Sequence, residues 1–177
     1  MSCAPVRLNH AVLFVADLAR AEQFYTQLFG MQVAAREPRT NATFLRLPGS
    51  GNHHDLGLFG VGPAAPPQRR GGLGLYHLAW QLDTLDDLAA ARRTLIHTGA
   101  YTGQSSHGAT KSVYGTDPDG NEFELMWMLP REHWGVYENA APVERLDLEA
   151  DLARWSGVRT AGWIVTDADQ WTDGTGR

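Results

Sequence analysis

The sequence predicts an α+β fold in which two tandem copies of one βαβββ unit form a single domain. Three observations favour it: an internal repeat, one amphipathic helical stretch in each copy, and three short strand-like segments after each helix. The 177 residues are 43% hydrophobic and 20% charged. Such a chain is long enough to bury one core, so a disordered polymer is excluded.

The repeat is visible as the segment LNHAVLFVADL, which begins at residue 8, and LYHLAWQLDTL, which begins 67 residues later. Each copy opens on an apolar residue, a variable residue and a histidine, and then continues as an apolar-rich strand. The match predicts that His10 and His77 occupy equivalent positions at the first strand of each copy.

A helix is expected directly after each first strand. In the first copy, apolar residues recur at helical spacing after the capping residue Asp17, and Gly30 is placed to end the helix. In the second copy, Thr84 and Asp87 resemble a capping box, and Gly99 closes the helix. Both copies therefore carry the same start and stop signals.

Short segments bounded by turn residues follow each helix and complete the two units. They read MQVAARE, NATFLRLP and HHDLGLFG in the first copy, and YTGQSS, ATKSVYGTD and NEFELMWML in the second. A Pro- and Gly-rich stretch separates the copies and indicates a linker. The expected domain covers residues 1–129 and comprises module one at 8–60, the linker at 61–73 and module two at 74–129. A C-terminal extension is expected over 130–177, with a short helix near 146–156 and a polar tail.

Composition narrows the classes of partner. The formal charge of −5, from 15 basic and 20 acidic residues, offers no basic surface for a nucleic acid or an acidic membrane. A single cysteine, Cys3, builds no disulfide framework, and no secretory pattern or membrane-length apolar run is present. We expect a cytoplasmic protein whose partners are small molecules or other proteins.

Three side chains suggest a metal site. His10 and His77 are related by the repeat, so approximate symmetry predicts that their imidazoles reach one central location. Glu124 lies on the last strand, on the face opposite Phe123 and Leu125, where a carboxylate is costly unless it is paired or binds a cation. Two imidazoles and one carboxylate leave coordination positions open and suit Fe(II), although Mn(II) or another divalent ion also fits.

With this repeat and ligand set, residues 8–129 resemble the vicinal oxygen chelate superfamily of glyoxalases, bleomycin resistance proteins and dioxygenases. The resemblance implies one cupped, barrel-like mixed sheet around a metal. The run from His107 through Tyr114 to Glu124 is similar to the signature of type I extradiol ring-cleavage dioxygenases, here most like single-domain, catechol 2,3-type enzymes. It implies Glu124 as the third iron ligand, and His107 and Tyr114 as pocket residues that hydrogen-bond the substrate.

The segment His53-His54-Asp55 resembles the family strand on which a histidine serves as acid-base catalyst. We assign that role to His54, with His53 as the alternative. The chain departs from the family signature at Ser105 and Ser106, immediately before His107.

The resemblance implies an Fe(II)-dependent extradiol dioxygenase that cleaves a catechol-type aromatic diol with O₂. A glyoxalase I-like isomerase, a thiol transferase and a metal-free binding protein of the same fold remain as alternatives. Glyoxalase I uses a carboxylate on the closing strand of module one, where this chain has only Leu56 to Phe59. That difference favours an open metal site; the oligomeric state stays open, a homo-oligomer included.

The sequence carries no readable code for the substrate. Aromatic residues suggest a lining for the pocket: Phe14, Trp80, Tyr101 and Trp127. Lys111 and Arg46 are expected to be solvated surface residues rather than ligands of a substrate carboxylate.

Overall fold

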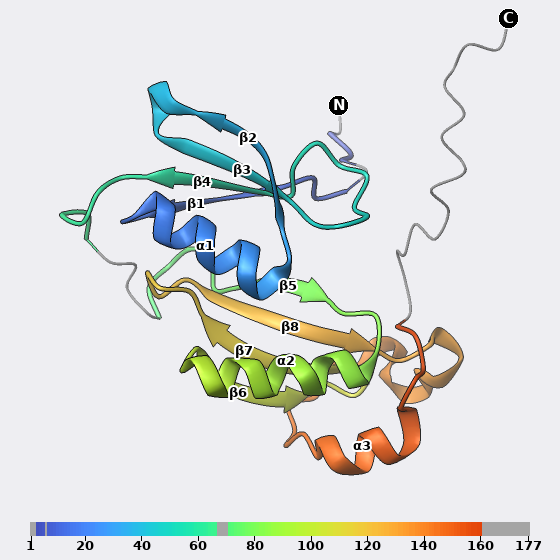
Figure 1. Ribbon diagram of the computed structural model, residues 1–177. Helices are drawn as coiled ribbons and strands as arrows, with labels where there is room; N and C mark the ends of the chain where they lie inside the picture. The colour runs from blue at the N-terminus through green and yellow to red at the C-terminus, as the bar shows by residue number, and fades with distance from the viewer. Residues whose placement is uncertain (1–2, 6, 67–70, 161–177) are drawn as a thin grey trace, which may run out of the picture. The chain divides into compact units, whose positions relative to one another are not determined.

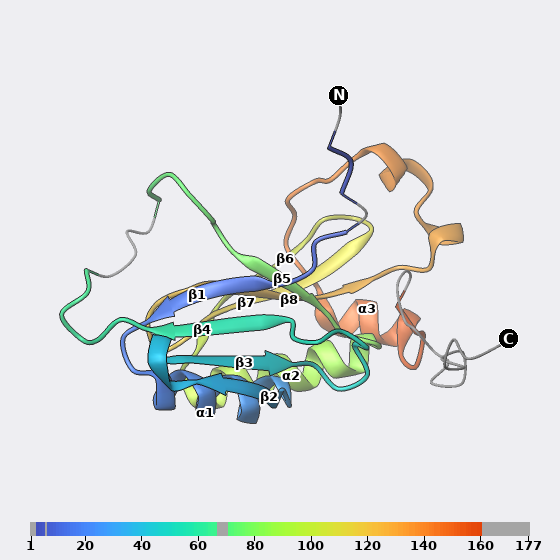
Figure 2. The ribbon, with the colours of Figure 1, turned by 90° about the horizontal axis from the view of Figure 1, so that it is seen from above.

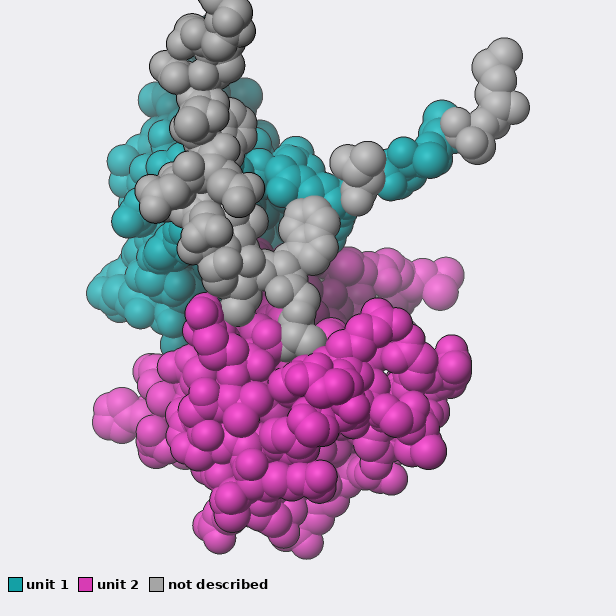
Figure 3. Space-filling view, turned by 90° about the vertical axis from the view of Figure 1, so that its right-hand side faces the viewer, with its two compact units in different colours: residues 1–67, 164–177 teal, residues 68–163 magenta. Residues whose placement is uncertain are grey.

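The computed structural model describes residues 3–5, 7–66 and 71–160, and it divides into two compact units. Unit 1 comprises residues 1–67 and 164–177, and unit 2 comprises residues 68–163 (Figure 3). The expected polar tail falls on residues 161–177, which lie outside the described residues. In the described part of the chain, every helix is too short or too polar to span a membrane.

Unit 1 is a four-stranded mixed sheet with one long helix. Its strands stand in the order β1-β4-β3-β2, with β1 parallel to β4 and the other pairs antiparallel (Figure 2). The elements are β1 (Ala11–Val15), α1 (Leu18–Phe29), β2 (Gln32–Glu37), the 3₁₀ turn η1 (Pro38–Thr40), β3 (Ala42–Arg46) and β4 (Leu56–Gly60).

Unit 2 repeats this topology and adds the C-terminal extension. Its sheet has the order β5-β8-β7-β6, again with one parallel pair, β5 and β8 (Figure 1). The elements are β5 (Leu78–Gln81), α2 (Leu85–Thr98), β6 (Tyr101–Ser106), β7 (Thr110–Thr116), β8 (Glu122–Met128), the 3₁₀ turns η2 (Arg131–His133) and η3 (Gly135–Asn139), and α3 (Leu148–Trp155).

The repeat and the α+β class are confirmed, down to the spacing of the elements. β5 begins 67 residues after β1, and α2 begins 67 residues after α1. The strands form two four-stranded sheets that are not closed into a barrel, where we expected one barrel-like sheet. The reason is that the first strand of each module pairs with its own last strand, so β1 and β5 each end a sheet.

The predicted helix signals act as expected. The Asp17 side chain accepts a hydrogen bond from the Arg20 N–H at 3.0 Å, and Gly30 ends α1 in the left-handed conformation (φ 64°). In α2, Thr84 and Asp87 form the reciprocal capping box. These local bonds satisfy backbone groups that a helix leaves without partners at its ends.

The core of unit 2 lies between α2 and one face of its sheet. Leu85, Leu88 and Leu95 of α2 are fully buried, as are Val113 and Trp127 of the sheet. Because side chains alternate along a strand, filling this face leaves the other face for the intervening residues. The packing thereby decides which residues of β7 and β8 can serve a site.

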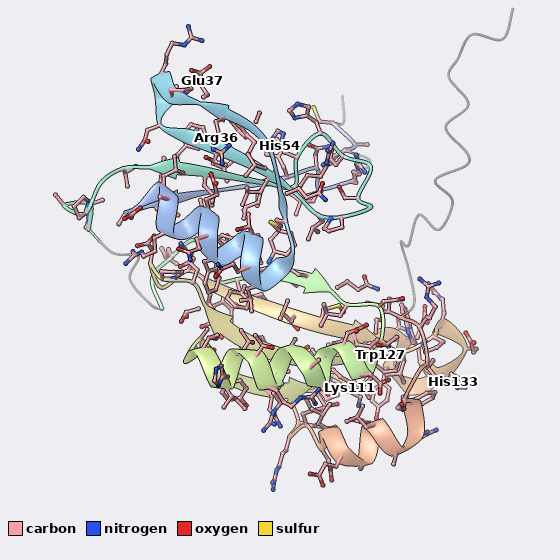
Figure 4. All side chains as sticks on the ribbon, in the orientation of Figure 1. Arg36, Glu37, His54, Lys111, Trp127 and His133 are labelled. Atoms are coloured by element: carbon pink, nitrogen blue, oxygen red, sulfur yellow. The ribbon has the colours of Figure 1, made fainter. Side chains whose placement is uncertain are left out.

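Trp127 belongs to this core and not to a pocket lining, which corrects our expectation for it (Figure 4). Its indole N–H donates to the Val158 carbonyl at 3.1 Å, and its ring lies 6.1 Å from that of Trp155. The extension is therefore anchored on unit 2 through a buried tryptophan.

Lys111 also differs from the expectation of a solvated surface residue (Figure 4). Its side chain is only 12% exposed, and its ammonium donates to Ser106 Oγ at 2.9 Å and lies 3.4 Å from the Asp151 carboxylate. The register places Lys111 opposite Trp127, so it shares the helix-covered face and links β7 to α3.

We expect Lys111→Met to lower the free energy of unfolding by about 2 kcal/mol, because the half-buried Asp151 carboxylate loses its cation. The exposed pair Arg159–Asp83 provides the control, since breaking it with Arg159→Gln should cost much less than the loss of Lys111. Urea titration followed by tryptophan fluorescence measures both. Equal costs for the two variants would contradict a structural role for the Lys111 pair.

Candidate active site

His77 and Glu124 meet on the face of the unit 2 sheet that α2 does not cover. His77 immediately precedes β5, and Ala79 is the register partner of Glu124 in the parallel β5–β8 pair. His77 Nε2 lies 3.0 Å from Glu124 Oε2. His10 and His77 each precede the first strand of their module by one residue, whereas we expected them on the strands.

The donor set of this pair fits a divalent metal ion. Two ligands bound at right angles, each about 2.1 Å from a metal, lie about 3.0 Å apart. The observed 3.0 Å between the imidazole nitrogen and the carboxylate oxygen matches that separation. The described residues contain no group of three or more His, Cys, Asp or Glu arranged to hold a metal ion.

A second cluster on the same face joins Ser105, His107 and Tyr114. The Tyr114 hydroxyl lies 2.8 Å from His107 Nε2, and Ser105 Oγ lies 2.8 Å from the same nitrogen and 3.0 Å from the hydroxyl. Tyr114 is the register partner of Glu124, and its ring centroid lies 5.8 Å from that of His77. The structure thus brings four predicted site residues of unit 2 to one region of the sheet.

The hydrogen bonds determine which atoms can donate. The Pro142 carbonyl, 2.8 Å from His107 Nδ1, can only accept, so Nδ1 donates to it and Nε2 faces the hydroxyls of Ser105 and Tyr114. Burial is the main cause that raises the pKa of Tyr114, and the Glu124 carboxylate raises it further. Hydrogen bonds with two serines act in the opposite direction and lower this pKa. The phenol therefore stays protonated near neutral pH and donates.

Sequence reasoning missed the residues that hold His107 in place. Residues 142–144 run beside β6, where Ser106 and Glu144 exchange two backbone hydrogen bonds of 2.9 Å each. Tyr137 packs on Gly108, whose φ of 75° favours glycine and whose missing Cβ leaves room for the ring. The one signal in the sequence was the departure from the family signature at Ser105, because the hydroxyl of this serine joins the cluster.

The other predicted site residues lie in unit 1. His10 and His54 stand with ring centroids 4.5 Å apart, and the Nδ1 atoms of His53 and His54 lie 2.9 Å apart. Burial is the first cause that lowers the pKa of His54, followed by the charges of His10 and His53, while Asp55 opposes the shift. The structure brings these three histidines together within unit 1.

An asparagine pair supports this histidine group. Asn9 Oδ1 lies 2.8 Å from His10 Nδ1, while Asn52 Nδ2 donates to the carbonyls of Asn9 and His54 at 2.8 Å each. A carbonyl-type acceptor on Nδ1 leaves His10 Nε2 available as a ligand, as is usual for histidines at metal sites. The segments that precede β1 and β4 are held together by these bonds.

Aromatic side chains gather on the same sheet in unit 1. The Phe14 and Phe59 rings lie 6.5 Å apart edge to face, and Phe44 contacts both Phe59 and His54 in the same manner. Phe14 is 70% exposed, unlike Trp127. Of the aromatic lining expected from the sequence, Phe14 has the open position that a lining requires.

Comparison with known proteins identifies relatives of this chain. Residues 7–125 match the family described as the Glyoxalase/Bleomycin resistance protein/Dioxygenase superfamily. A catechol-2,3-dioxygenase of Bacillus subtilis (strain 168) is 32% identical over 127 residues, which are 72% of this chain and 43% of that protein. A biphenyl-2,3-diol 1,2-dioxygenase 3 of Rhodococcus globerulus is 34% identical over 121 residues, which are 67% of this chain and 62% of that protein.

The fold is also found among solved structures. A glyoxylase/bleomycin resistance protein/dioxygenase domain from Frankia sp. EAN1pec superposes with a TM-score of 0.61 at 21% identity, over 71% of this chain and 100% of that one. At that identity the likeness concerns the fold. This chain spans less than two thirds of the length of both curated relatives.

Proposed function

This chain belongs to the Glyoxalase/Bleomycin resistance protein/Dioxygenase superfamily, and from that premise we propose that it is a metal-dependent extradiol dioxygenase that cleaves a catechol-type aromatic diol with O₂. Both curated relatives are named as dioxygenases of aromatic diols, which supports this choice within the superfamily. The fold alone would not support it, because one fold hosts many activities.

The observation that carries the proposal is the pairing of two clusters on one face of the unit 2 sheet. The His77–Glu124 pair has the separation of two metal ligands, and Tyr114, opposite Glu124, presents a protonated hydroxyl beside it. A diol bound at the pair would meet the Tyr114 hydroxyl, whose other hydrogen-bond partner is His107 Nε2. No carboxylate is present on β4, as a closed four-ligand site would need.

The proposed metal ligands are His10, His77 and Glu124, and the proposed metal is Fe(II), with Mn(II) or another divalent ion as the substitute. Such an ion, when bound, supplies open positions for the two diol oxygens and for O₂ and lowers the pKa of the diol. Asn9 would keep His10 Nδ1 engaged, so that Nε2 faces the ion.

The remaining roles belong to side chains that hold or move protons. On substrate binding, the Tyr114 hydroxyl would turn its proton from His107 Nε2 to an oxygen of the substrate, where a donor stabilises developing negative charge. His107, with Nδ1 on Pro142, would exchange the proton of the Tyr114 hydroxyl through Nε2, and Ser105 would keep both groups aligned. His54 is the proposed acid-base residue, since its lowered pKa keeps the imidazole neutral and able to accept a proton near pH 7.

Oxygen uptake is the experiment that tests the proposal. The protein is loaded anaerobically with Fe(II), mixed with a panel of catechols, and followed with an oxygen electrode and by the absorbance of a ring-opened product. We expect stoichiometric uptake of O₂ with at least one diol. Metal binding without uptake across mono- and biaryl diols would contradict the dioxygenase and favour another chemistry at the same site.

Replacing the donor of the Ser105–His107–Tyr114 cluster should separate catalysis from metal binding. We expect Tyr114→Phe to lower kcat about 100-fold, because one oriented donor is lost, while metal content stays unchanged. Tyr101→Phe is the matched control, since its hydroxyl bonds Gln104 away from the cluster. Equal kcat for both variants would contradict the role of Tyr114.

A further inference from the structure

Unit 2 contains a cavity of about 600 Å³ between α2, β6 and the segment that leads into α3. Three arginines line it: Arg92 and Arg93, which are neighbours on α2, and Arg145, which precedes α3. The half-buried Leu148 and Leu152 give the cavity an apolar wall. A cationic rim over an apolar wall is suited to a molecule with one charged end.

The guanidinium groups have hydrogen-bonding capacity to spare. Arg92 donates through Nε to Gln104 Oε1 at 2.6 Å, and its guanidinium group lies over the Tyr101 ring. Its two terminal nitrogens are therefore available to donate to a ligand. The side chains of Arg93 and Arg145 make no hydrogen bond or ion pair with any residue that the structure describes. Guanidinium groups in this state favour carboxylates, which they bind through paired hydrogen bonds.

Two acids also line the cavity, and they limit the charge that it can hold. The Asp147 carboxylate is engaged at the start of α3, where it accepts a hydrogen bond from the Ala150 N–H at 3.1 Å. Glu149 is exposed beside it. Three cations against two anions leave one net positive charge, which one carboxylate neutralises.

We propose that this cavity binds a small monocarboxylate with an apolar body, such as an aryl or branched alkyl acid. The carboxylate pairs with Arg93 and Arg145, and the apolar body rests on Leu148 and Leu152. The site is separate from the candidate active site and does not depend on the proposed function. Gln104 faces the cavity, while Ser105, its neighbour on β6, faces the opposite side of the sheet.

Titration with benzoate, followed in two-dimensional amide NMR spectra at low ionic strength, tests the proposal. We expect saturable shifts confined to α2, β6 and the start of α3, no binding of the neutral analogue benzamide, and weaker binding of inorganic phosphate. Arg93→Gln and Arg145→Gln should each weaken benzoate binding about tenfold, since each removes one charged donor. Glu149→Gln should strengthen it, because a competing negative charge is removed.

Arg46→Gln is the matched control, since Arg46 is exposed in unit 1 and has no part in the cavity. Absence of saturable shifts, or benzoate affinity that all three cavity variants leave unchanged, would overturn the site. If inorganic phosphate bound as tightly as benzoate, the proposal that an apolar body contributes to binding would be overturned. Because the readout is binding, none of these outcomes depends on whether the protein cleaves a diol.

Discussion

Glu124→Gln is expected to abolish oxygen uptake and to weaken metal binding by more than about 100-fold. A neutral amide is a poorer ligand for a hard divalent ion than a carboxylate, and it keeps the size and shape of the side chain. Glu122→Gln, two residues earlier on β8, is the matched control and should retain both properties. Bound iron and Mn(II) affinity are measured beside the rate of oxygen uptake.

The stability of the metal-free protein distinguishes a lost ligand from a lost fold. Glu124 is 8% exposed, and a buried carboxylate is costly in the absence of a cation. We therefore expect the apo form of Glu124→Gln to be at least as stable as the apo wild type in urea. An iron content equal to that of the wild type would exclude Glu124 as a ligand, whatever the activity.

Trp127→Ala should produce the largest loss of stability, about 3–5 kcal/mol, because it opens a cavity in the core and removes a buried hydrogen bond. The side chain is fully buried and joins β8 to the Val158 carbonyl and to Trp155. Trp127→Phe should cost less, since it keeps most of the apolar volume. Unfolding in urea, followed by circular dichroism, gives the free energies.

Phe14→Ala provides the comparison for an aromatic side chain on an open face. Phe14 is 70% exposed, so its removal should change the free energy of unfolding by under about 1 kcal/mol. A loss for Trp127→Ala no greater than that for Phe14→Ala would contradict the placement of Trp127 in the core.

Local signals in the sequence were enough to predict the elements and their order. Asp17, Thr84 and Asp87 act on backbone groups within one turn of themselves, so their effect does not depend on the rest of the fold. The repeat of 67 residues likewise predicted matching topologies, because the same apolar pattern buries the same face twice. Alternation along β8 was enough to assign Glu124 to the face opposite Phe123 and Leu125, although all three side chains are buried.

Sequence alone thus determined the α+β class and the two modules, and it predicted the residue types of the proposed metal site. Tertiary structure decided the contacts between segments distant in the chain: Pro142 on His107, Asp151 on Lys111, and Val158 on Trp127. It also decided that the strands form two sheets. The physical reason is that caps and strand alternation depend on neighbours within a few residues, whereas a hydrogen bond across 35 residues leaves no periodic trace in the sequence.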